Sequence, residues 1–474
     1  MSLTKKEIEA VVEKQRMFFR TGKTLDIEFR VRQLNRLKKA VIEFQNEIVS
    51  ALEEDLGRTK EEAYFCDIGT VIAEINETIA GVRKWARTER HYSGMMCFPS
   101  MLTKVHKMPY GTVLIISPFN FPFLLSLGVL TAAIAGGNTA VIKASSKSVK
   151  STEVLRKLIG SIFPEQYCFV ADGGHDVADM CLDIRFDKIF YTGSPKVARH
   201  VMAKAAENLT PVALELGGET GNWCIVRKDA DLKDAARKIA FFKICNAGQI
   251  CININQVAVA EEVADEFLNL LMKEFTRQIG EGISAVNNPE YPKLITPAAY
   301  NKCRDEAQAY AERIIYGGIG LASKQKYAPT IIYPVKPDES LVNHELFSPL
   351  LPVVPFKDSE VKDLLNTISS REHGLALYLF TRSRAWADRV MSTRQYGGGC
   401  VNEVCLHLMV KGVPFNGTGH SGMGAYHGIW GFREFTHPST VLYGSSHFNL
   451  PLREHPYSGR ANAYKMKFIK MCER

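Results

Sequence analysis

Residues 111–143 read GTVLIISPFNFPFLLSLGVLTAAIAGGNTAVIK, and this stretch decides the fold class. The apolar run 111–135 is long enough to suggest a membrane span, but Pro118 and Pro122 divide it into a β-branched strand and a separate helix. A second short apolar strand ends the stretch. We therefore predict a buried strand, helix and strand in the interior of a globular protein.

The same alternation of short apolar runs and helical stretches continues along the chain. The buried strands expected in this region are 113–116, 140–142, 167–170 and 188–191. Because strands that alternate with helices form parallel sheets covered on both faces, the pattern predicts a wound α/β domain. A second series predicts a second α/β domain, with strands near 223–226, 256–260 and 330–333 and a helix over 264–277.

Two other regions have different patterns. Over residues 4–90 the apolar positions recur every three or four residues, as at Leu34 and Leu37, which predicts amphipathic helices. The segment 85–110 is neither periodic nor strongly helical. Together with residues 436–443, it is predicted to form an arm outside both cores.

The composition is typical of a globular protein of two or three domains, with 474 residues of which 46% are apolar. The net charge is +8, and the chain has no dense Lys/Arg block with interleaved aromatic residues, which disfavours nucleic-acid binding. The 11 cysteines include no CxxC pair, so neither a disulfide framework nor a zinc site is indicated. A reducing cytosol is the expected compartment, and no signal peptide is recognisable.

The sequence Asn-Ala-Gly-Gln-Ile-Cys at 246–251 places one thiol in a short irregular segment between an apolar helix and a β-branched run. Backbone N–H groups beside Gly248 can stabilise negative charge on sulfur or on a bound oxygen. Cys251 is therefore a candidate nucleophile. The alternative, which applies to most single cysteines, is a structural thiol in the core.

Three polar segments follow predicted strands, where ligands bind in wound sheets. Asn120 can donate hydrogen bonds from its amide, although a turn asparagine between prolines is the simpler interpretation. Lys143 and Ser146 can hold ribose or phosphate oxygens, with an ordinary exposed strand end as the alternative. Gly193 and Ser194 precede a helix, where a small turn lets pyrophosphate approach backbone N–H groups, although a GxGxxG fingerprint is absent.

Two carboxylates are further candidates. Glu215 lies between leucines, and a buried carboxylate without a partner has a pKa raised toward neutrality, which suits a general base. An interdomain salt bridge is the alternative interpretation. Glu345 and Phe347, in the sequence His-Glu-Leu-Phe-Ser-Pro at 344–349, offer a carboxylate and an aromatic ring in a loop, unless both serve packing alone.

Through these residues the chain resembles the aldehyde dehydrogenase superfamily, in one fixed order from about Leu25 to Tyr443. The family shows a Trp-Asn-Phe/Tyr-Pro loop, a Lys-Pro-Ser-Glu strand end, Phe-Thr-Gly-Ser, Leu-Glu-Leu-Gly-Gly-Lys, Gln-x-Cys, Glu-x-Phe-Gly-Pro and Pro-Phe-Gly-Gly. The chain carries a recognisable counterpart of each. Its stretch 419–428 and short N-terminus look most like the class 3 branch, which is typically dimeric.

The resemblance implies that the protein oxidises an aldehyde to the carboxylic acid and reduces NADP or NAD. Cys251 would attack the aldehyde carbon, and Asn120 with the Cys251 backbone N–H would form the oxyanion hole. Glu215 would activate the water that hydrolyses the thioester. The implied cofactor contacts are Lys143 and Ser146 at the adenosine ribose, Gly193 and Ser194 at the pyrophosphate, Glu345 at the nicotinamide ribose and Phe347 beside the cofactor.

A free thiol with a pKa of about 8.5 is only slightly ionised at neutral pH, so this reaction leads us to expect a lowered pKa for Cys251. No metal ligand is implied by the resemblance. The expected substrate is an apolar aliphatic or aromatic aldehyde, which the sequence does not specify further.

The chain departs from the family pattern at several positions. Ser146 replaces the ribose-binding glutamate and so removes a carboxylate that would repel the 2′-phosphate of NADP; we predict that NADP is accepted. Glu219 replaces a lysine and either raises the pKa of Glu215 or points to solvent. The other replacements are Phe119, Ala144, Ser348 and Asn416, and the cysteine is followed by Ile252-Asn253-Ile254 in place of a small residue and proline.

The resemblance also divides the chain. It implies a Rossmann-like NAD(P)-binding domain (1–90 and 111–216), a catalytic domain (217–434), a small β arm for oligomerisation (91–110 and 435–448) and a C-terminal tail (449–474). A homodimer is expected. The tail lacks an apolar run of spanning length, so no stable membrane anchor is expected, although peripheral contact through its lysines and aromatic residues is a hypothesis.

Two other functions stay open. In a CoA-acylating enzyme a thiol intercepts the acyl-enzyme, but Glu215 argues against this because a water-activating base would be superfluous. The second alternative is a protein of this fold with little turnover that binds a cofactor or an aldehyde. The presence of Asn120, Glu215, Cys251 and Glu345 together argues against it.

Overall fold

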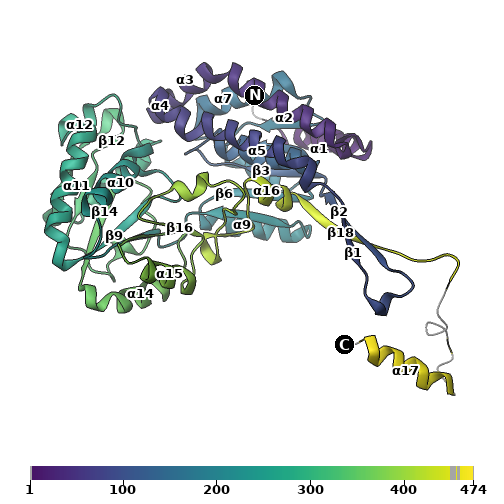
Figure 1. Cartoon of the computed structure of the whole chain (residues 1–474). Coiled ribbons are helices and arrows are strands. Elements are labelled where there is room, and N and C mark those ends of the chain that lie inside the picture. Colours follow the sequence, from purple (N-terminus) through teal and green to yellow (C-terminus); the bar gives the residue numbers. More distant parts are fainter. Residues whose placement is uncertain (1–2, 449–454, 456–459, 473–474) are drawn as a thin grey trace.

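The computed structural model describes residues 3–448, 455 and 460–472. Two large sheets, each with helices on both sides, lie side by side, and a narrow arm projects from one of them (Figure 1). The mixed α/β class with parallel sheets, which the sequence predicts, is confirmed.

Within residues 3–448 the first sheet has six strands in the order β17-β7-β6-β3-β4-β5. All neighbours are parallel except β17, which pairs antiparallel with β7. The strands expected from the sequence are present as β3 to β6. The bounds are β3 (Thr112–Ile116), β4 (Thr139–Lys143), β5 (Cys168–Ala171), β6 (Lys188–Gly193), β7 (Val212–Leu216) and β17 (Gly422–Met423).

Helices cover both faces of this sheet, and successive side chains of each strand point alternately to one face and to the other. In β3, Val113 and Ile115 pack into one apolar cluster and Leu114 into another. The first face is covered by α2 (Ile27–Glu43), α3 (Gln45–Leu56), α5 (Gly69–Trp85), α6 (Val129–Gly136) and α7 (Val149–Ile162), with the short α4 (Lys60–Ala63) beside them. The second face is covered by α1 (Lys5–Arg20), α8 (His175–Leu182) and α9 (Pro195–Glu207).

The second sheet, counted over the same described range, has seven strands in the order β10-β13-β14-β9-β8-β15-β16, and only β10 is antiparallel. Its strands are β8 (Asn222–Val226), β9 (Ile254–Ala260), β10 (Ile314–Tyr316), β13 (Thr330–Ile332), β14 (Leu350–Phe356), β15 (Ala376–Phe380) and β16 (Gly398–Val401). A small hairpin joins β11 (Gly320–Leu321) to β12 (Lys326–Tyr327). The helices of this half are α10 (Leu232–Ile244), α11 (Ala264–Ile279), α12 (Ile283–Asn287), α13 (Pro297–Gln308), α14 (Val361–Ser369) and α15 (Arg384–Thr393).

The two segments expected to form an arm do pair with each other. β2 (Leu102–Pro109) lies between β1 (Glu89–Tyr92) and β18 (Thr436–Tyr443) in an antiparallel sheet that extends away from both larger sheets (Figure 1). The helix α16 (Gly428–Glu434) leads into β18. Beyond the arm, α17 (Arg460–Cys472) lies close to the turn Met95–Cys97.

Part of the predicted C-terminal tail, residues 449–454, 456–459 and 473–474, lies outside the described residues. Among the helices that the structure describes, none combines the length and the apolar character needed to cross a bilayer.

Candidate active site

A cavity of about 550 Å³ is lined by residues at the carboxyl ends of strands β3, β6 and β7 and by loops of the second half of the chain. Most of the residues singled out from the sequence line it: Asn120, Gly193, Ser194, Glu215, Cys251, Glu345 and Phe347. The carboxyl ends of parallel strands are where wound sheets bind ligands. Side chains that are far apart in sequence therefore meet in one place.

Cys251 follows an unusually tight turn at the end of α10. Asn246, Ala247 and Gly248 all have left-handed backbone angles, with φ values of 51°, 49° and 77°. A side chain at Gly248 would place its Cβ 2.2 Å from the carbonyl oxygen of Ser348, so only glycine fits this close approach. The Cys251 carbonyl then accepts a hydrogen bond of 2.8 Å from Asn222 Nδ2, which fixes the loop against β8.

Asn120 is held beside this turn by both its amide and its backbone. Its Nδ2 donates to the carbonyl of Gln249 at 3.1 Å, and its own carbonyl accepts from Asn246 Nδ2 at 3.1 Å. An amide nitrogen carries two hydrogens, so one remains for a ligand in the cavity. The arrangement suits a donor aimed at an oxygen atom near the Cys251 thiol.

Arg58, which the sequence analysis did not single out, connects the two loops. This fully buried side chain forms an ion pair with Asp67 and donates to Asn246 Oδ1 at 3.1 Å and to the carbonyl of Asn120. Asp67 in turn accepts hydrogen bonds from the backbone after Asn120, at Phe123 and Leu124. Arg58 follows a helix without any distinctive motif, so only its position in the fold reveals this role.

The two carboxylates of the cavity are poorly solvated. Burial raises the pKa of Glu215 to about 7, and the Cys251 thiol partly offsets this effect. Apart from this thiol, neither carboxylate oxygen of Glu215 has a hydrogen-bond partner among the described residues. Burial likewise raises the pKa of Glu345 to about 8, with Lys302 lowering it and the like charge of Glu215 raising it.

The expectation of a lowered pKa for Cys251 is wrong for this structure. Burial raises the pKa of the thiol well above its usual value, and the charges of Glu215 and Glu345 raise it further. The loop therefore presents a neutral thiol next to a carboxylate that titrates near neutrality. Such a pair can generate a thiolate by transferring the proton from sulfur to Glu215.

The other end of the cavity has features that fit a dinucleotide. Ser194 caps α9, whose first backbone N–H groups have no helical partner and can bind phosphate oxygens. The buried Thr192 hydroxyl beside it has no hydrogen-bond partner within the described range. Phe119 and Phe347 meet edge to face across the cavity wall, with ring centroids 5.9 Å apart.

Two of the predicted cofactor contacts do not line the cavity. Lys143 is buried and its Nζ donates to the carbonyls of Ala144 at 2.6 Å and Gly173 at 2.8 Å, whereas Ser146 is exposed to solvent. Lys147, which the sequence analysis passed over, does line the cavity, with Nζ 5.4 Å from the centre of the Phe119 ring.

Glu219 lies away from the base. It pairs with Arg199 at 2.5 Å and with His420 at 3.0 Å, and chiefly the Arg199 hydrogen bond lowers its pKa. The Glu215 carboxylate therefore keeps its raised pKa through burial and not through repulsion by Glu219. Of the two expectations for Glu219, the surface position is the one observed.

A second, narrow cavity of about 60 Å³ reaches Cys251 from another side. Its walls are almost entirely apolar or aromatic, and they come from the helices before β1, the segment after β3, α10 with the turn that follows it, and the loop between β16 and α16. The lining includes Phe65, Phe121, Phe242, Leu408, Met409 and Phe415. The thiol therefore lies between a polar cavity and an apolar one.

Comparisons with known proteins agree with this arrangement. Residues 1–441 match a family model described as the aldehyde dehydrogenase family. The 4,4'-diaponeurosporen-aldehyde dehydrogenase of Staphylococcus aureus is 34% identical over 463 residues, which cover 98% of each chain. The aldehyde dehydrogenase family 3 comG of Dictyostelium discoideum is 35% identical over 458 residues, covering 95% of each. A solved structure of the substrate-bound state of Staphylococcus aureus AldH is 33% identical, covers both chains completely and has a TM-score of 0.93.

Proposed function

Since this chain belongs to the aldehyde dehydrogenase family and so oxidises aldehydes to carboxylic acids with NAD or NADP, we propose that Cys251, Glu215 and Asn120 carry out this reaction. The observation that supports the assignment is the position of all three side chains in one cavity. They supply a nucleophile, a base with a pKa of about 7 and an amide donor.

The chemistry begins with proton transfer from the Cys251 thiol to Glu215. The thiolate then forms a C–S bond with the aldehyde carbon, and the carbonyl electron pair moves onto oxygen. Asn120 Nδ2 and the Cys251 backbone N–H donate hydrogen bonds to this oxygen, where charge develops in the transition state. Glu345 and Phe347 line the cavity where a nicotinamide ring would be held, and that ring would supply the acceptor for the hydride that the adduct loses.

Glu215 has a second task in the hydrolysis of the thioester. Once Glu215 has released the Cys251 proton to solvent, its carboxylate takes a proton from the attacking water, and Cys251 leaves as the thiolate when the C–S bond breaks. A base with no hydrogen-bond partner in the described structure other than the Cys251 thiol is available for this step. This argues for hydrolysis over transfer of the acyl group to CoA.

The main experiment compares the wild-type protein with Cys251→Ala and Glu215→Gln on a panel of aldehydes, with and without CoA. We expect Cys251→Ala to form no NAD(P)H. Glu215→Gln should give at most one equivalent of NAD(P)H per site and then stall at the thioester. Multiple turnover by Cys251→Ala would refute the assignment, and a rate that depends on CoA would favour the acylating alternative.

The NADP-binding proposal rests on the absence of a carboxylate at position 146. Ser146 cannot repel the 2′-phosphate, and Lys147 adds a positive charge at the cavity wall. We expect Ser146→Glu to lower kcat/KM with NADP at least about tenfold and to affect NAD much less, as judged from the cost of a like-charge contact. An equal effect on both cofactors would contradict the proposal.

The substrate is proposed to be an apolar aldehyde. The narrow cavity beside Cys251 is lined by aromatic and aliphatic side chains, and no charged side chain of the described structure lines it. Burying CH₂ groups there contributes roughly 0.8 kcal/mol each. In the aldehyde panel, kcat/KM should therefore rise with aliphatic chain length or with an aromatic ring.

The protein is also proposed to be a homodimer joined through the arm, because the arm exposes apolar side chains, including Val441, Leu442 and Tyr443. The cytosol is the proposed compartment. The described cysteines form no disulfide with one another, as expected in a reducing environment.

A further inference from the structure

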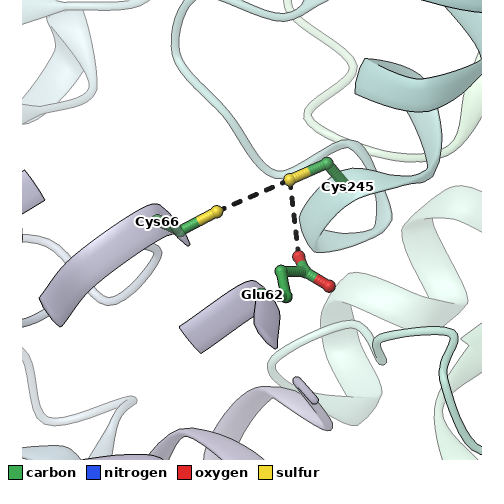
Figure 2. A group of neighbouring side chains, drawn as sticks. All are labelled: Glu62, Cys66 and Cys245. Atoms are coloured by element: carbon green, nitrogen blue, oxygen red, sulfur yellow. Dashed lines mark hydrogen bonds between the residues drawn. The ribbon is translucent and has the colours of Figure 1, made fainter. Parts of the chain in front are cut away.

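Three metal-binding side chains meet beside the catalytic loop without taking part in the proposed reaction. Glu62 lies on α4, Cys66 on the short helical segment Tyr64–Ile68, and Cys245 begins the turn Cys245–Gly248. Figure 2 shows the Cys245 sulfur between the Cys66 sulfur and the Glu62 carboxylate. One ligand atom from each residue lies within 4.8 Å of the other two.

We propose that Glu62, Cys66 and Cys245 form a binding site for a soft divalent cation, of which Zn²⁺ is the physiological representative. Thiolate sulfur together with carboxylate oxygen is a ligand set that Zn²⁺ takes in tetrahedral geometry. The three ligands come from both halves of the chain. An ion here would tie the N-terminal helices to the segment that carries Cys251.

The distances favour a shared ion. With Zn–S bonds of about 2.3 Å and a Zn–O bond of about 2.0 Å, tetrahedral geometry places the two sulfurs about 3.8 Å apart and sulfur and oxygen about 3.5 Å apart. The Cys66 and Cys245 sulfurs are 3.6 Å apart, and Cys245 Sγ lies 3.5 Å from Glu62 Oε1. A disulfide would instead require about 2.0 Å between the sulfurs.

The charges balance as well. Two Zn–S bonds form as two S–H bonds break, and the two protons leave to solvent. The two positive charges of the ion therefore take the place of the charges of the two protons. Arg58, whose Nε lies 3.9 Å from the Glu62 carboxylate, therefore faces the same net charge before and after binding.

The cavity beside the two thiols leaves room for a further ligand. Cys66 and Cys245 both line the narrow apolar cavity that reaches Cys251. Zinc sites with three protein ligands complete their coordination with water or another small ligand. The Glu62 carboxylate is held in place because Asn246 donates its backbone N–H to Oε1 at 2.6 Å.

A cobalt titration tests the site in the Cys251→Ala protein under a phosphine reductant, so that the nucleophile cannot serve as a ligand. We expect one Co²⁺ per chain, a thiolate-to-cobalt charge-transfer band and displacement by Zn²⁺. Cys66→Ser and Cys245→Ser should each halve the band and weaken binding at least about tenfold. Cys400→Ser is the matched control, because this half-buried thiol lies beside a possible second ligand, His407 Nδ1, at 3.4 Å.

Absence of the charge-transfer band, or a band unchanged in both serine variants, would overturn the proposal. X-ray absorption of the unsubstituted zinc-loaded protein keeps the test independent of how the variants fold. Two sulfurs at about 2.3 Å with oxygen at about 2.0 Å would support the site. A shell without sulfur would overturn it. Because Cys251 chemistry is not needed for either readout, failure here leaves the proposed reaction unaffected.

Discussion

The raised pKa of Glu215 implies a cost in stability that depends on pH. Its carboxyl is buried and titrates at about 7 in the folded protein, above its value in the unfolded chain. The folded state therefore holds this proton more tightly, and the stability that it contributes is lost as the pH rises toward the folded pKa. Glu215→Gln, which stays neutral, should gain stability relative to the wild type by about 2.5 kcal/mol between about pH 5 and about pH 8.5.

Chemical denaturation at the two pH values measures this difference. Glu219→Gln is the control, since its half-exposed carboxylate has a lowered pKa and is ionised in both the folded and the unfolded protein over this pH range, so its stability difference from wild type should stay nearly constant. A difference between Glu215→Gln and wild type that stays constant with pH would show that the Glu215 pKa is not raised in the folded protein.

Gly217 controls where the Glu345 carboxylate lies. A Cβ at position 217 would come 1.9 Å from Glu345 Oε1, so Gly217→Ala must displace this side chain from the cofactor cavity. If Glu345 binds the nicotinamide ribose, KM for the cofactor should rise about tenfold, which corresponds to the loss of one hydrogen bond of about 1.4 kcal/mol. Gly160→Ala makes the same change on α7 with open space around the new methyl group, and steady-state kinetics should leave its KM unchanged.

Residues that carry a local motif are predictable from the sequence, whereas residues that act only through the fold are not. Cys251, Glu215 and Asn120 lie in recognisable short segments, and the structure brings them into one cavity. Arg58 has no such segment. The thiols of Cys66 and Cys245 are separated by 179 residues, so short cysteine spacings such as CxxC do not reveal the cluster that they form.

Among the elements, strands with continuous β-branched runs are predicted well and strands with disruptive residues are not. β3 to β6 appear close to their expected bounds because both faces are apolar. β7 contains Glu215, and β14 contains Pro352 and Pro355, so neither fits an uninterrupted apolar run. Tertiary burial overrides these local signals.

The turn before Cys251 and the loop after β3 are elements that depend on Arg58. Arg58→Lys keeps the charge but cannot reach Asp67, Asn246 and the Asn120 carbonyl together, since lysine lacks the planar fork. A displacement of the oxyanion donor by about 1 Å can cost roughly 100-fold in rate, so we expect kcat to fall by about that factor. Kinetics below the melting temperature of the variant measure it.

Arg30→Lys separates this effect from simple destabilisation. Arg30 is also a buried arginine that donates to backbone carbonyls, at Thr24 and Ala135, but it lies outside the catalytic cavity. Both variants should lower the melting temperature, and only Arg58→Lys should lower kcat in the folded protein. An equal loss of kcat in the two variants would contradict the positioning role.

In the whole molecule, the catalytic cavity and the proposed cation site both use residues from the two halves of the chain. Cys251 and Glu345 come from the half with the second sheet, while Asn120 follows β3 and Gly193 ends β6 of the first. The reacting groups are therefore aligned only if the two halves keep a fixed relation. In the proposed dimer, contact with the second copy through the arm would restrict the first half and so help to keep the reacting groups aligned.

The arm is the part of the molecule that a second copy would cover. β18 is an edge strand of the three-stranded sheet, and Val441, Leu442 and Tyr443 are between 41% and 46% exposed, an apolar surface of the kind that pairs with another chain. Lysine on an edge strand opposes such pairing, so Val441→Lys with Leu442→Lys should convert the proposed dimer to a single chain of 53.0 kDa in light scattering. Ile283→Lys, at an exposed apolar residue of α12 far from the arm in sequence, is the control and should leave the mass unchanged. A dimer that persists in the arm variant would mean that another surface joins the copies.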